Sequence, residues 1–380
     1  MVRTPVETGI RRARALAAAV FATAALVLAA APASAQNSLQ GYALKIFRVE
    51  PALYPFVQVY FRTFDQNKEP LINLNELNVG LMVGGRSYNP TKMQYRLESI
   101  KTRREAIRSI LILDASISMK GRPFDEAVKA AARYIDSKRP QDQVALIAIR
   151  DTKEGYEIVS NFERDPGALG RRLADVRCDG QRTRLYDTIG AAMQMAGMPS
   201  QGGGDDNDYI VSTSIVVFSD GKDEGSALSR EELNGRITSL EIPIPIYSIA
   251  YTKMNREYFK NLESISKNSF GIYYEIGEAM EKMQRTVESI QNILQSDYVL
   301  TFRSYVPVDG AEHNFKLGVE YPSKSGKFTY QSSKFEAIEP PPVPALTSKI
   351  AALDQMMKKV PDGNPYFDAQ PAGAPAPGAN

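Results

Sequence analysis

Four short apolar runs, separated by stretches long enough to form helices, most constrain the fold of this 380-residue chain. They occupy residues 110–113, 144–149, 215–218 and 244–250. Runs of this length without polar alternation are typical of strands that are buried on both faces. Their alternation with helix-length segments predicts an α/β fold with a doubly wound, mostly parallel sheet.

The segments between these runs carry helix signals. Apolar residues at positions 124, 127, 128, 131 and 135 fall on one helical face, and Pro140 follows as a stop. Ser229 and Glu232 have the spacing of a capping box that opens a later helix. These signals support a helix after each of two predicted strands.

Polar oxygens follow two of the predicted strands. Asp114, Ser116 and Ser118 alternate after the first run, and Asp220 comes after the third. In open α/β sheets, ligands bind at the carboxyl ends of the strands, and Mg²⁺ prefers oxygen ligands. The alternatives are local. The serines would cap the following helix, Thr183 would be an N-cap, and Asp220-Gly221 would be a turn.

Taken together, the motifs resemble the von Willebrand factor type A domain. The resemblance rests on the Asp-x-Ser-x-Ser run, on Thr183 before Leu-Tyr-Asp, and on Asp-Gly after a hydrophobic strand, over roughly residues 108 to 292. It implies a metal-ion-dependent adhesion site. The implied ligands are Asp114, Ser116, Ser118, Thr183 and Asp220. Ile117 stands where many members have glycine, and Tyr186 and Asp187 are expected to support the site without touching the metal.

The resemblance also implies how such a site works. The cation would be Mg²⁺, with Mn²⁺ or Ca²⁺ as alternatives, and it would keep one position open for a Glu or Asp carboxylate of a partner protein. Five basic residues lie close to the ligands in sequence: Lys120, Arg122, Arg182, Arg184 and Lys222. Four acidic residues oppose them: Asp125, Asp187, Asp223 and Glu224. This rim is either net attractive for acidic partners or a set of ordinary solvated charges.

Residues 1–35 are predicted to be a signal peptide. Four arginines precede an Ala-rich apolar run, and Ala33-Ser34-Ala35 fits a cleavage site before Gln36. An uncleaved anchor is the alternative, but the run is shorter than the roughly 20 apolar residues of a spanning helix. We therefore expect an exported protein, periplasmic or secreted, without a stable membrane span after cleavage.

Composition narrows the class of function further. Cleavage would remove four Arg and one Glu from the 46 basic and 44 acidic residues, leaving a net charge near −1. Such a balance gives no nucleic-acid footprint. The single cysteine, Cys178, allows no internal disulfide, and the single histidine, His313, disfavours a Ser-His-Asp hydrolase or a His-rich zinc site.

The regions on either side of the α/β segment are rich in strand signals. We expect residues 36–106 and 295–337 to pair into one Ig-like sandwich of about seven strands, with the type A domain at 107–294 inserted within it. The Pro- and Ala-rich tail, 338–380, is expected to be largely disordered, with a possible helix at 347–359. The polar segment at 201–208 lacks the spacing of an EF-hand and is expected to be a loop.

The favoured function is therefore a metal-dependent protein–protein interaction, in adhesion or docking. One alternative is a structural module of an envelope assembly whose metal site is not essential. The other is a metal-assisted hydrolase. No general base other than the site's carboxylates, no phosphate-binding loop and no nucleophile elbow is evident, so we expect no enzyme.

Overall fold

The computed structural model describes residues 43–65, 69–198, 210–240, 242–251, 256–321 and 325–357. The predicted signal peptide, the segment at 201–208 and the last residues of the tail lie outside these ranges. All described residues belong to one unit of the chain, Tyr42–Asn380. Within these ranges, no helix has both the length and the apolar character needed to cross a membrane.

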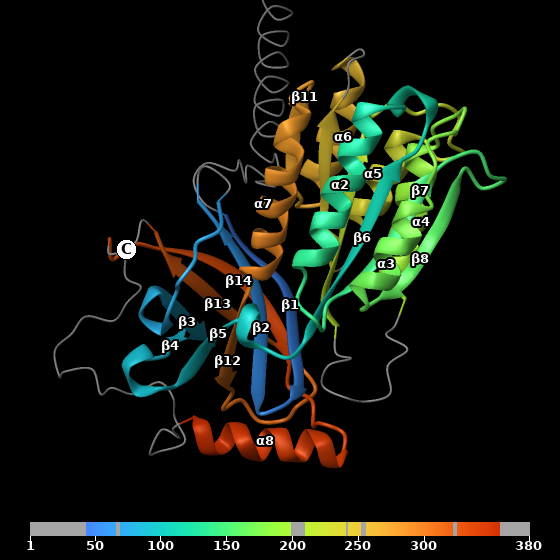
Figure 1. Cartoon of the computed structure of the whole chain (residues 1–380). Helices are drawn as coiled ribbons and strands as arrows, with labels where there is room; N and C mark the ends of the chain where they lie inside the picture. The colour runs from blue at the N-terminus through green and yellow to red at the C-terminus, as the bar shows by residue number, and fades with distance from the viewer. Residues whose placement is uncertain are drawn as a thin grey trace, which may run out of the picture. The chain divides into compact units, whose positions relative to one another are not determined.

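Six strands form the sheet of the α/β part, in the order β11-β10-β9-β6-β7-β8. Figure 1 shows this part with β6, β7, β8 and β11 labelled, together with its helices. Their bounds are β6 (Ala106–Asp114), β7 (Gln143–Ile149), β8 (Tyr156–Glu163), β9 (Ile210–Ser219), β10 (Ile246–Tyr251) and β11 (Tyr273–Gly277). Neighbouring strands are parallel except β8, which runs antiparallel to β7. The sheet is mixed and mostly parallel, as predicted, and the four apolar runs form its four inner strands.

Helices cover both faces of this sheet. One face packs against α2 (Arg122–Ser137), α3 (Pro166–Ala174) and α7 (Met283–Gln295). The other face packs against α4 (Leu185–Ala196), α5 (Arg230–Thr238) and α6 (Phe259–Asn268). Within β6, Leu111 and Leu113 point to the first core, and Ile110 and Ile112 to the second. A strand buried on both faces needs an unbroken apolar run, which is why these strands were visible in the sequence.

The helix boundaries follow local chemistry. Pro123 lies in the first turn of α2, where a backbone N–H would have no helical acceptor, so proline's lack of an N–H costs no hydrogen bond. Helix α2 ends at Ser137, ahead of Pro140. The capping box of α5 is confirmed. The Glu232 N–H donates to Ser229 Oγ at 3.2 Å, and the Ser229 N–H donates to Glu232 Oε2 at 2.8 Å.

Two antiparallel sheets flank the α/β part in sequence. Their orders are β1-β2-β12-β5 and β14-β13-β3-β4. The bounds are β1 (Ala43–Leu53), β2 (Phe56–Phe64), β3 (Val79–Val83), β4 (Arg86–Ser87), β5 (Tyr95–Ser99), β12 (Tyr298–Arg303), β13 (Glu312–Glu320) and β14 (Phe328–Glu336). Short 3₁₀ turns also occur at η1 (Glu76–Asn78), η2 (Pro90–Lys92), η3 (Ile100–Thr102), η6 (Arg256–Tyr258) and η7 (Met280–Lys282).

Strands from the two flanking segments pair with each other. β12 lies between β2 and β5, and β13 pairs with β3. Side chains from both sheets share one buried core, which includes Val59, Leu81, Leu300 and Leu317. The chain therefore leaves this β region after β5 and returns to it at β12. The described residues hold eight strands here, close to the expected seven, and an Ig-like strand connectivity stays a prediction.

A buried ion pair fixes the junction between α7 and β12. Asp297 lies between these elements, and its carboxylate accepts hydrogen bonds from Arg62 Nε at 2.5 Å and Arg62 Nη2 at 2.6 Å. Arg62 also donates to the Tyr247 hydroxyl. Because Arg62 belongs to β2 and Tyr247 to β10, this cluster joins the antiparallel sheet to the α/β sheet.

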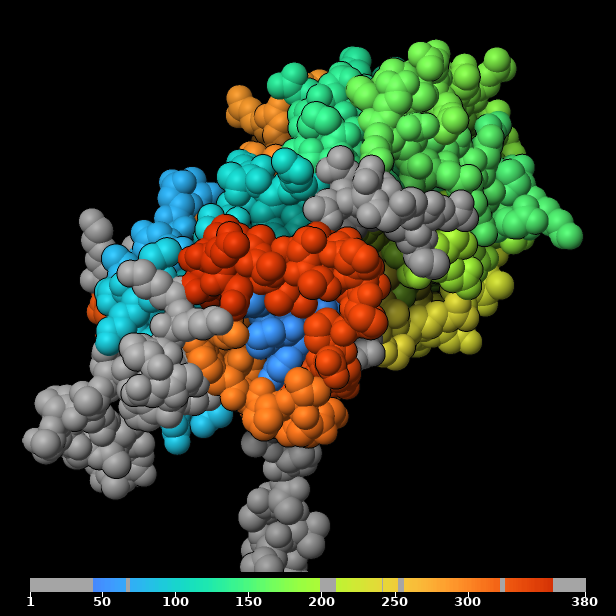
Figure 2. Space-filling model, turned by 90° about the horizontal axis from the view of Figure 1, so that it is seen from below, coloured from blue at the N-terminus to red at the C-terminus, as the bar shows by residue number. Residues whose placement is uncertain are grey.

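Part of the predicted tail is folded. Helix α8 spans Pro344–Met356, close to the helix expected at 347–359. Its Leu346, Ile350 and Leu353 pack against Leu53 and Phe56. Figure 2 shows α8, in red, lying next to blue residues from the first part of the described chain, where it contacts β1. Asp354 pairs with Arg303, so the helix is held by both apolar and charged contacts.

Candidate functional site

The sheet brings Asp114 and Asp220 to the same edge. β6 and β9 are parallel neighbours with Leu113 opposite Phe218, so both carboxylates follow at the carboxyl end. Both residues are buried, with exposed fractions of 0% and 3%. Burial, together with the negative charge of Asp220, raises the pKa of Asp114 to about 6. Two buried carboxylates in mutual repulsion are costly, and such an arrangement is a candidate site for a cation.

Hydrogen bonds connect the Asp-x-Ser-x-Ser run to Asp220. The Ser116 N–H donates to Asp114 Oδ1 at 3.1 Å, and the Ser116 and Ser118 hydroxyls are 3.0 Å apart. The Ser118 hydroxyl donates to Asp220 Oδ2 at 3.1 Å. The second Asp114 oxygen, Oδ2, accepts from the Ser219 hydroxyl at 2.7 Å. The carboxylates and two serine hydroxyls thus form one connected group of oxygens.

The candidate ligands contribute little to capping the neighbouring helices. Neither serine caps α2, because its N-cap residue is Gly121, and Ser116 makes no capping bond to the 3₁₀ turn η4 (Ile117–Met119). Thr183 does not cap α4, whose N-cap residue is Arg184. Asp220 does take part in a turn, since its Oδ1 accepts from the Lys222 N–H at 2.9 Å. Its Oδ2 nevertheless faces Ser118.

The loop that carries Thr183 is bound to the Asp-x-Ser-x-Ser loop. The Ile117 N–H donates to the Gly180 carbonyl at 2.7 Å, and the Gly180 N–H donates to the Ala115 carbonyl at 3.0 Å. The Thr183 carbonyl accepts from the Glu224 N–H at 2.6 Å. The side chain of Thr183 is fully buried, and its hydroxyl has no hydrogen-bond partner among the residues described. A buried hydroxyl without a partner calls for an explanation, and a bound cation would supply one.

Sequence reasoning missed Asp151, which positions this loop. Its Oδ2 accepts from the Gln181 N–H at 2.7 Å, and its Oδ1 accepts from the Arg182 N–H at 3.2 Å. The signal was present, because Asp151 follows the apolar run at 144–149 as Asp114 follows 110–113. Asp151 therefore acts on the candidate site through the backbone that precedes Thr183.

Two further carboxylates tie the loop after β9 to the start of α4. Asp187 accepts from the Ala227 and Leu228 N–H groups at 2.8 and 2.9 Å. Asp223 accepts from the Tyr186 N–H at 3.2 Å. Their oxygens are engaged by backbone donors, so we assign these two residues a supporting role around Thr183 and Asp220.

Gly221 allows the chain to turn directly after Asp220. Its φ is +79°, and a Cβ placed there would lie 2.4 Å from the Tyr258 carbonyl oxygen. Only glycine meets both conditions without a shift of the backbone.

We expect Gly221→Ala to destabilise the protein by about 1–3 kcal/mol more than Gly225→Ala, because of this added steric clash. Gly225 also has a positive φ, +101°, but a Cβ there meets nothing within 4 Å, so it is a matched control for backbone strain alone. Urea unfolding followed by far-UV circular dichroism would measure both. Equal losses would show that the loop relaxes away from Tyr258 at little cost.

The predicted basic rim is partly neutralised within the chain. Lys222 pairs with Glu224 at 2.5 Å, and Arg122 with Glu281 at 3.9 Å. In the part of the chain described, no ion pair involves the other three: Lys120, Arg182 and Arg184. Ile117, which lies between the candidate ligands Ser116 and Ser118 in the chain, is 48% exposed. The residues that neighbour the candidate ligands in the chain therefore include both positive charge and an exposed apolar side chain.

The donor set suits a hard cation. Asp114, Asp220 and the three hydroxyls supply only oxygen, which Mg²⁺, Mn²⁺ and Ca²⁺ accept. Across the described ranges, no cluster of three or more His, Cys, Asp or Glu residues has the geometry for a metal. The nearby Cys178 donates its thiol proton to the Ser116 carbonyl at 3.0 Å, and burial raises its pKa to about 11. At neutral pH it is a thiol and not a thiolate ligand.

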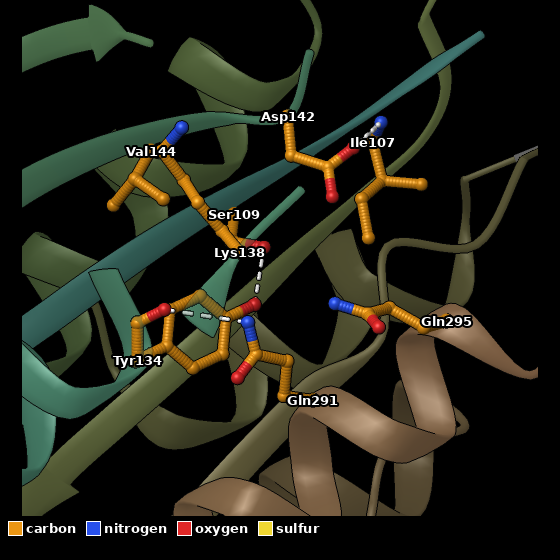
Figure 3. Close-up of a pocket in the computed structure, with 8 residues that line it drawn as sticks. All are labelled: Ile107, Ser109, Tyr134, Lys138, Asp142, Val144, Gln291 and Gln295. Carbon is orange, nitrogen blue, oxygen red and sulfur yellow. Dashed lines mark hydrogen bonds between the residues drawn. The ribbon is translucent and has the colours of Figure 1, made fainter. Parts of the chain in front are cut away.

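Two cavities lie away from the candidate ligands. A cavity of about 10 Å³ lies between β6, β7, α2 and α7 (Figure 3). Its lining includes Ser109 and Tyr134, whose hydroxyls are 2.6 Å apart, and Gln291. Such a volume has room for about one water and not for a substrate. A second depression, of about 280 Å³, lies against β3 and β13 and touches none of the candidate ligands.

Comparison with known families identifies part of the chain. Residues 109–222 match the sequence profile of the von Willebrand factor type A domain. The matched segment contains Asp114, Ser116, Ser118, Thr183 and Asp220. A type A domain is therefore confirmed at residues 109–222, and the boundaries 107–294 stay a prediction. The mixed, mostly parallel sheet with covering helices is the fold described above. The comparison with curated proteins returned no match.

Several solved structures are similar in fold. A von Willebrand factor type A protein from Catenulispora acidiphila has a TM-score of 0.42 at 13% identity, over 80% of this chain and 75% of that one. The SpRpn10 VWA domain has a TM-score of 0.36 at 14% identity, over 48% and 93%. Three N-terminal domains of the type V pili tip protein Mfa5 from Porphyromonas gingivalis give 0.34 at 10%, over 79% and 78%. At these identities and scores, the likenesses say nothing about what this chain binds.

Proposed function

We propose that this chain, which carries a von Willebrand factor type A domain at residues 109–222, is an exported protein that docks an acidic partner protein through Mg²⁺. Type A domains commonly mediate protein–protein interactions and are generally not enzymes. The observation that carries the proposal is the Thr183 hydroxyl, which is buried without a partner among the described residues, on a loop whose backbone is hydrogen-bonded to the Asp-x-Ser-x-Ser loop and to the loop after Asp220.

In this proposal, five residues hold the cation: Asp114, Ser116, Ser118, Thr183 and Asp220. The two carboxylates supply charge and the three hydroxyls supply neutral oxygens, so the repulsion between the buried aspartates is relieved. Once bound, the cation would take an anionic oxygen from the partner in an open position. Mn²⁺ or Ca²⁺ would suit the same oxygens.

The surface around the site supports an acidic partner. Lys120, Arg182 and Arg184 place positive charge near the ligands, which favours a Glu or Asp over a neutral residue. The exposed Ile117 adds an apolar contact next to that carboxylate. Neither nucleic acid nor a membrane surface is proposed as the ligand.

Two other functions are less well supported. A hydrolase would need a general base, and the only histidine, His313, lies in β13 and is bound to Asp309 at 3.0 Å. A structural module with a nonessential metal site would leave the repulsion between Asp114 and Asp220, and the Thr183 hydroxyl that has no partner among the described residues, without an explanation. We retain the docking function as the proposal.

The decisive experiment is a pull-down from envelope and culture fractions with the mature chain from Gln36 onward. A partner should be captured in Mg²⁺, and lost both in EDTA and with Asp114→Ala in Mg²⁺. Asp136→Ala is the matched control, because Asp136 is an exposed carboxylate on α2. This variant should retain the partner in Mg²⁺. Equal capture in every arm would mean that the partner binds elsewhere and would refute metal-dependent docking for it.

A further inference from the structure

One buried hydroxyl near the candidate site belongs to no part of the Asp-x-Ser-x-Ser, Thr and Asp-Gly pattern. Tyr251 is the last residue of β10, and the preceding residue, Ala250, pairs with Ser219 of β9. The parallel register therefore places Tyr251 level with Asp220, at the carboxyl edge of the sheet. The side chain of Tyr251 is completely buried.

The Tyr251 hydroxyl differs from those of other buried tyrosines. Tyr134 bonds to Ser109, and Tyr247, four residues earlier on β10, accepts from Arg62. The Tyr251 hydroxyl has no hydrogen-bond partner among the described residues. Buried tyrosine hydroxyls usually find a partner, because a desolvated donor without one is unfavourable.

The surroundings of this hydroxyl are anionic. Burial first, and then the negative charges of Asp114 and Asp220, raise the pKa of Tyr251 well above its ordinary value. The phenol is therefore a neutral donor near two carboxylates, yet it makes no direct hydrogen bond to either of them. A donor held near acceptors that it does not reach is suited to a bridging water.

We propose that Tyr251 is a positioning residue of the cation site, whose hydroxyl donates a hydrogen bond to a water of the cation's hydration shell between Asp114 and Asp220. This inference rests on the proposed function and adds a fourth hydroxyl to the three of the sequence motif. By holding that water, Tyr251 would orient the two carboxylates toward the metal without touching it.

The test compares Tyr251→Phe with Tyr247→Phe in the mature chain, with Mn²⁺ as the probe. Both variants remove one buried phenolic oxygen from β10 and keep the ring. Titration calorimetry would give the Mn²⁺ affinity, water-proton relaxation would report the waters on bound Mn²⁺, and urea unfolding in EDTA would give the stability without metal.

We expect Tyr251→Phe to weaken Mn²⁺ binding about tenfold or more, as loss of an outer hydrogen-bond partner typically does, and to change the relaxation of bound Mn²⁺. Its urea midpoint in EDTA should be unchanged or higher, because a buried donor without a partner has been removed. Tyr247→Phe should show the opposite pattern, with a lower midpoint and unchanged Mn²⁺ affinity, because Arg62 loses an acceptor.

The outcomes separate this inference from the proposed function. If the unaltered chain does not bind Mn²⁺, the cation site itself is wrong. If that chain binds Mn²⁺ and Tyr251→Phe binds it equally well, the role of Tyr251 is wrong and the site stands. If the phenylalanine variant does not fold, 3-fluorotyrosine at position 251 provides the readout. Its ¹⁹F resonance should shift with Mg²⁺, whereas the same label at 247 should not, and an unmoved resonance at 251 would overturn the inference.

Discussion

We expect that replacing Asp114 by asparagine will make the cation-free protein more stable and will remove the stabilisation that the proposed Mg²⁺ site predicts for the native chain. In EDTA at pH 7, the Asp114 carboxylate is buried and repelled by Asp220, and its pKa is raised to about 6. Each unit of pKa shift corresponds to about 1.4 kcal/mol. We therefore expect Asp114→Asn to gain about 1–3 kcal/mol of unfolding free energy without metal.

Saturating Mg²⁺ should reverse the order of stability of the native chain and Asp114→Asn. A cation that binds only the folded state stabilises it by about 2.7 kcal/mol at a concentration 100 times its dissociation constant. The native chain should gain this amount, and Asp114→Asn should gain little, because one of its two anionic ligands is gone. Urea unfolding in EDTA and in saturating Mg²⁺ would measure both effects in one series.

The pH dependence provides an internal check. The folded state raises the pKa of Asp114 above its ordinary value of 3.8, so protonation favours folding. The unfavourable contribution of this group is therefore absent below about pH 4 and grows as the pH rises through about 6. In EDTA, the advantage of Asp114→Asn should be large at pH 7 and vanish below pH 4. If the variant is instead less stable at pH 7, the bonds of Asp114 to Ser116 and Ser219 outweigh the repulsion, and the site is structural.

The candidate ligands could be proposed from the sequence because the segments that carry them have strong local signals. Asp114 and Asp220 end apolar runs that are buried on both faces, and parallel strands bring such ends to one edge. Tyr251 also ends a buried strand and Asp151 comes two residues after one, but the sequence does not show whether a tyrosine hydroxyl or a loop carboxylate faces inward. That depends on the strand register and on which loop lies beside Thr183, and both are set by tertiary packing.

The strands also divide into those that the sequence predicts and those that depend on tertiary packing. The inner strands β6, β7, β9 and β10 could be located because both of their faces are buried. The edge strands β8 and β11 could not, because their exposed faces interrupt the apolar run. The pairing of the two flanking β regions could be predicted because each is too short to form a full sandwich alone. Their strand order could not, because it depends on the pairing of β12 with β2 and with β5, which precede β12 by about 200 residues or more.

One of those long-range contacts should carry a large share of the stability. We expect Asp297→Ala to destabilise the protein by about 3–5 kcal/mol, because Arg62 would remain buried without its carboxylate. The side chains of Arg62 and Asp297 are only 6% and 2% exposed, and their two hydrogen bonds are parallel and short. Urea unfolding monitored by far-UV circular dichroism would measure the loss.

A matched control is the exposed pair Lys334–Glu312, whose nitrogen and oxygen are 2.7 Å apart and whose side chains are 58% and 56% exposed. Glu312→Ala should cost no more than about 1 kcal/mol, because solvent screens that pair. The double change Arg62→Met with Asp297→Leu should recover much of the stability, since it removes the unpaired charge along with its partner. If Asp297→Ala costs no more than Glu312→Ala, water or a rearranged side chain compensates Arg62, and the ion pair does not hold the antiparallel sheet to the α/β sheet.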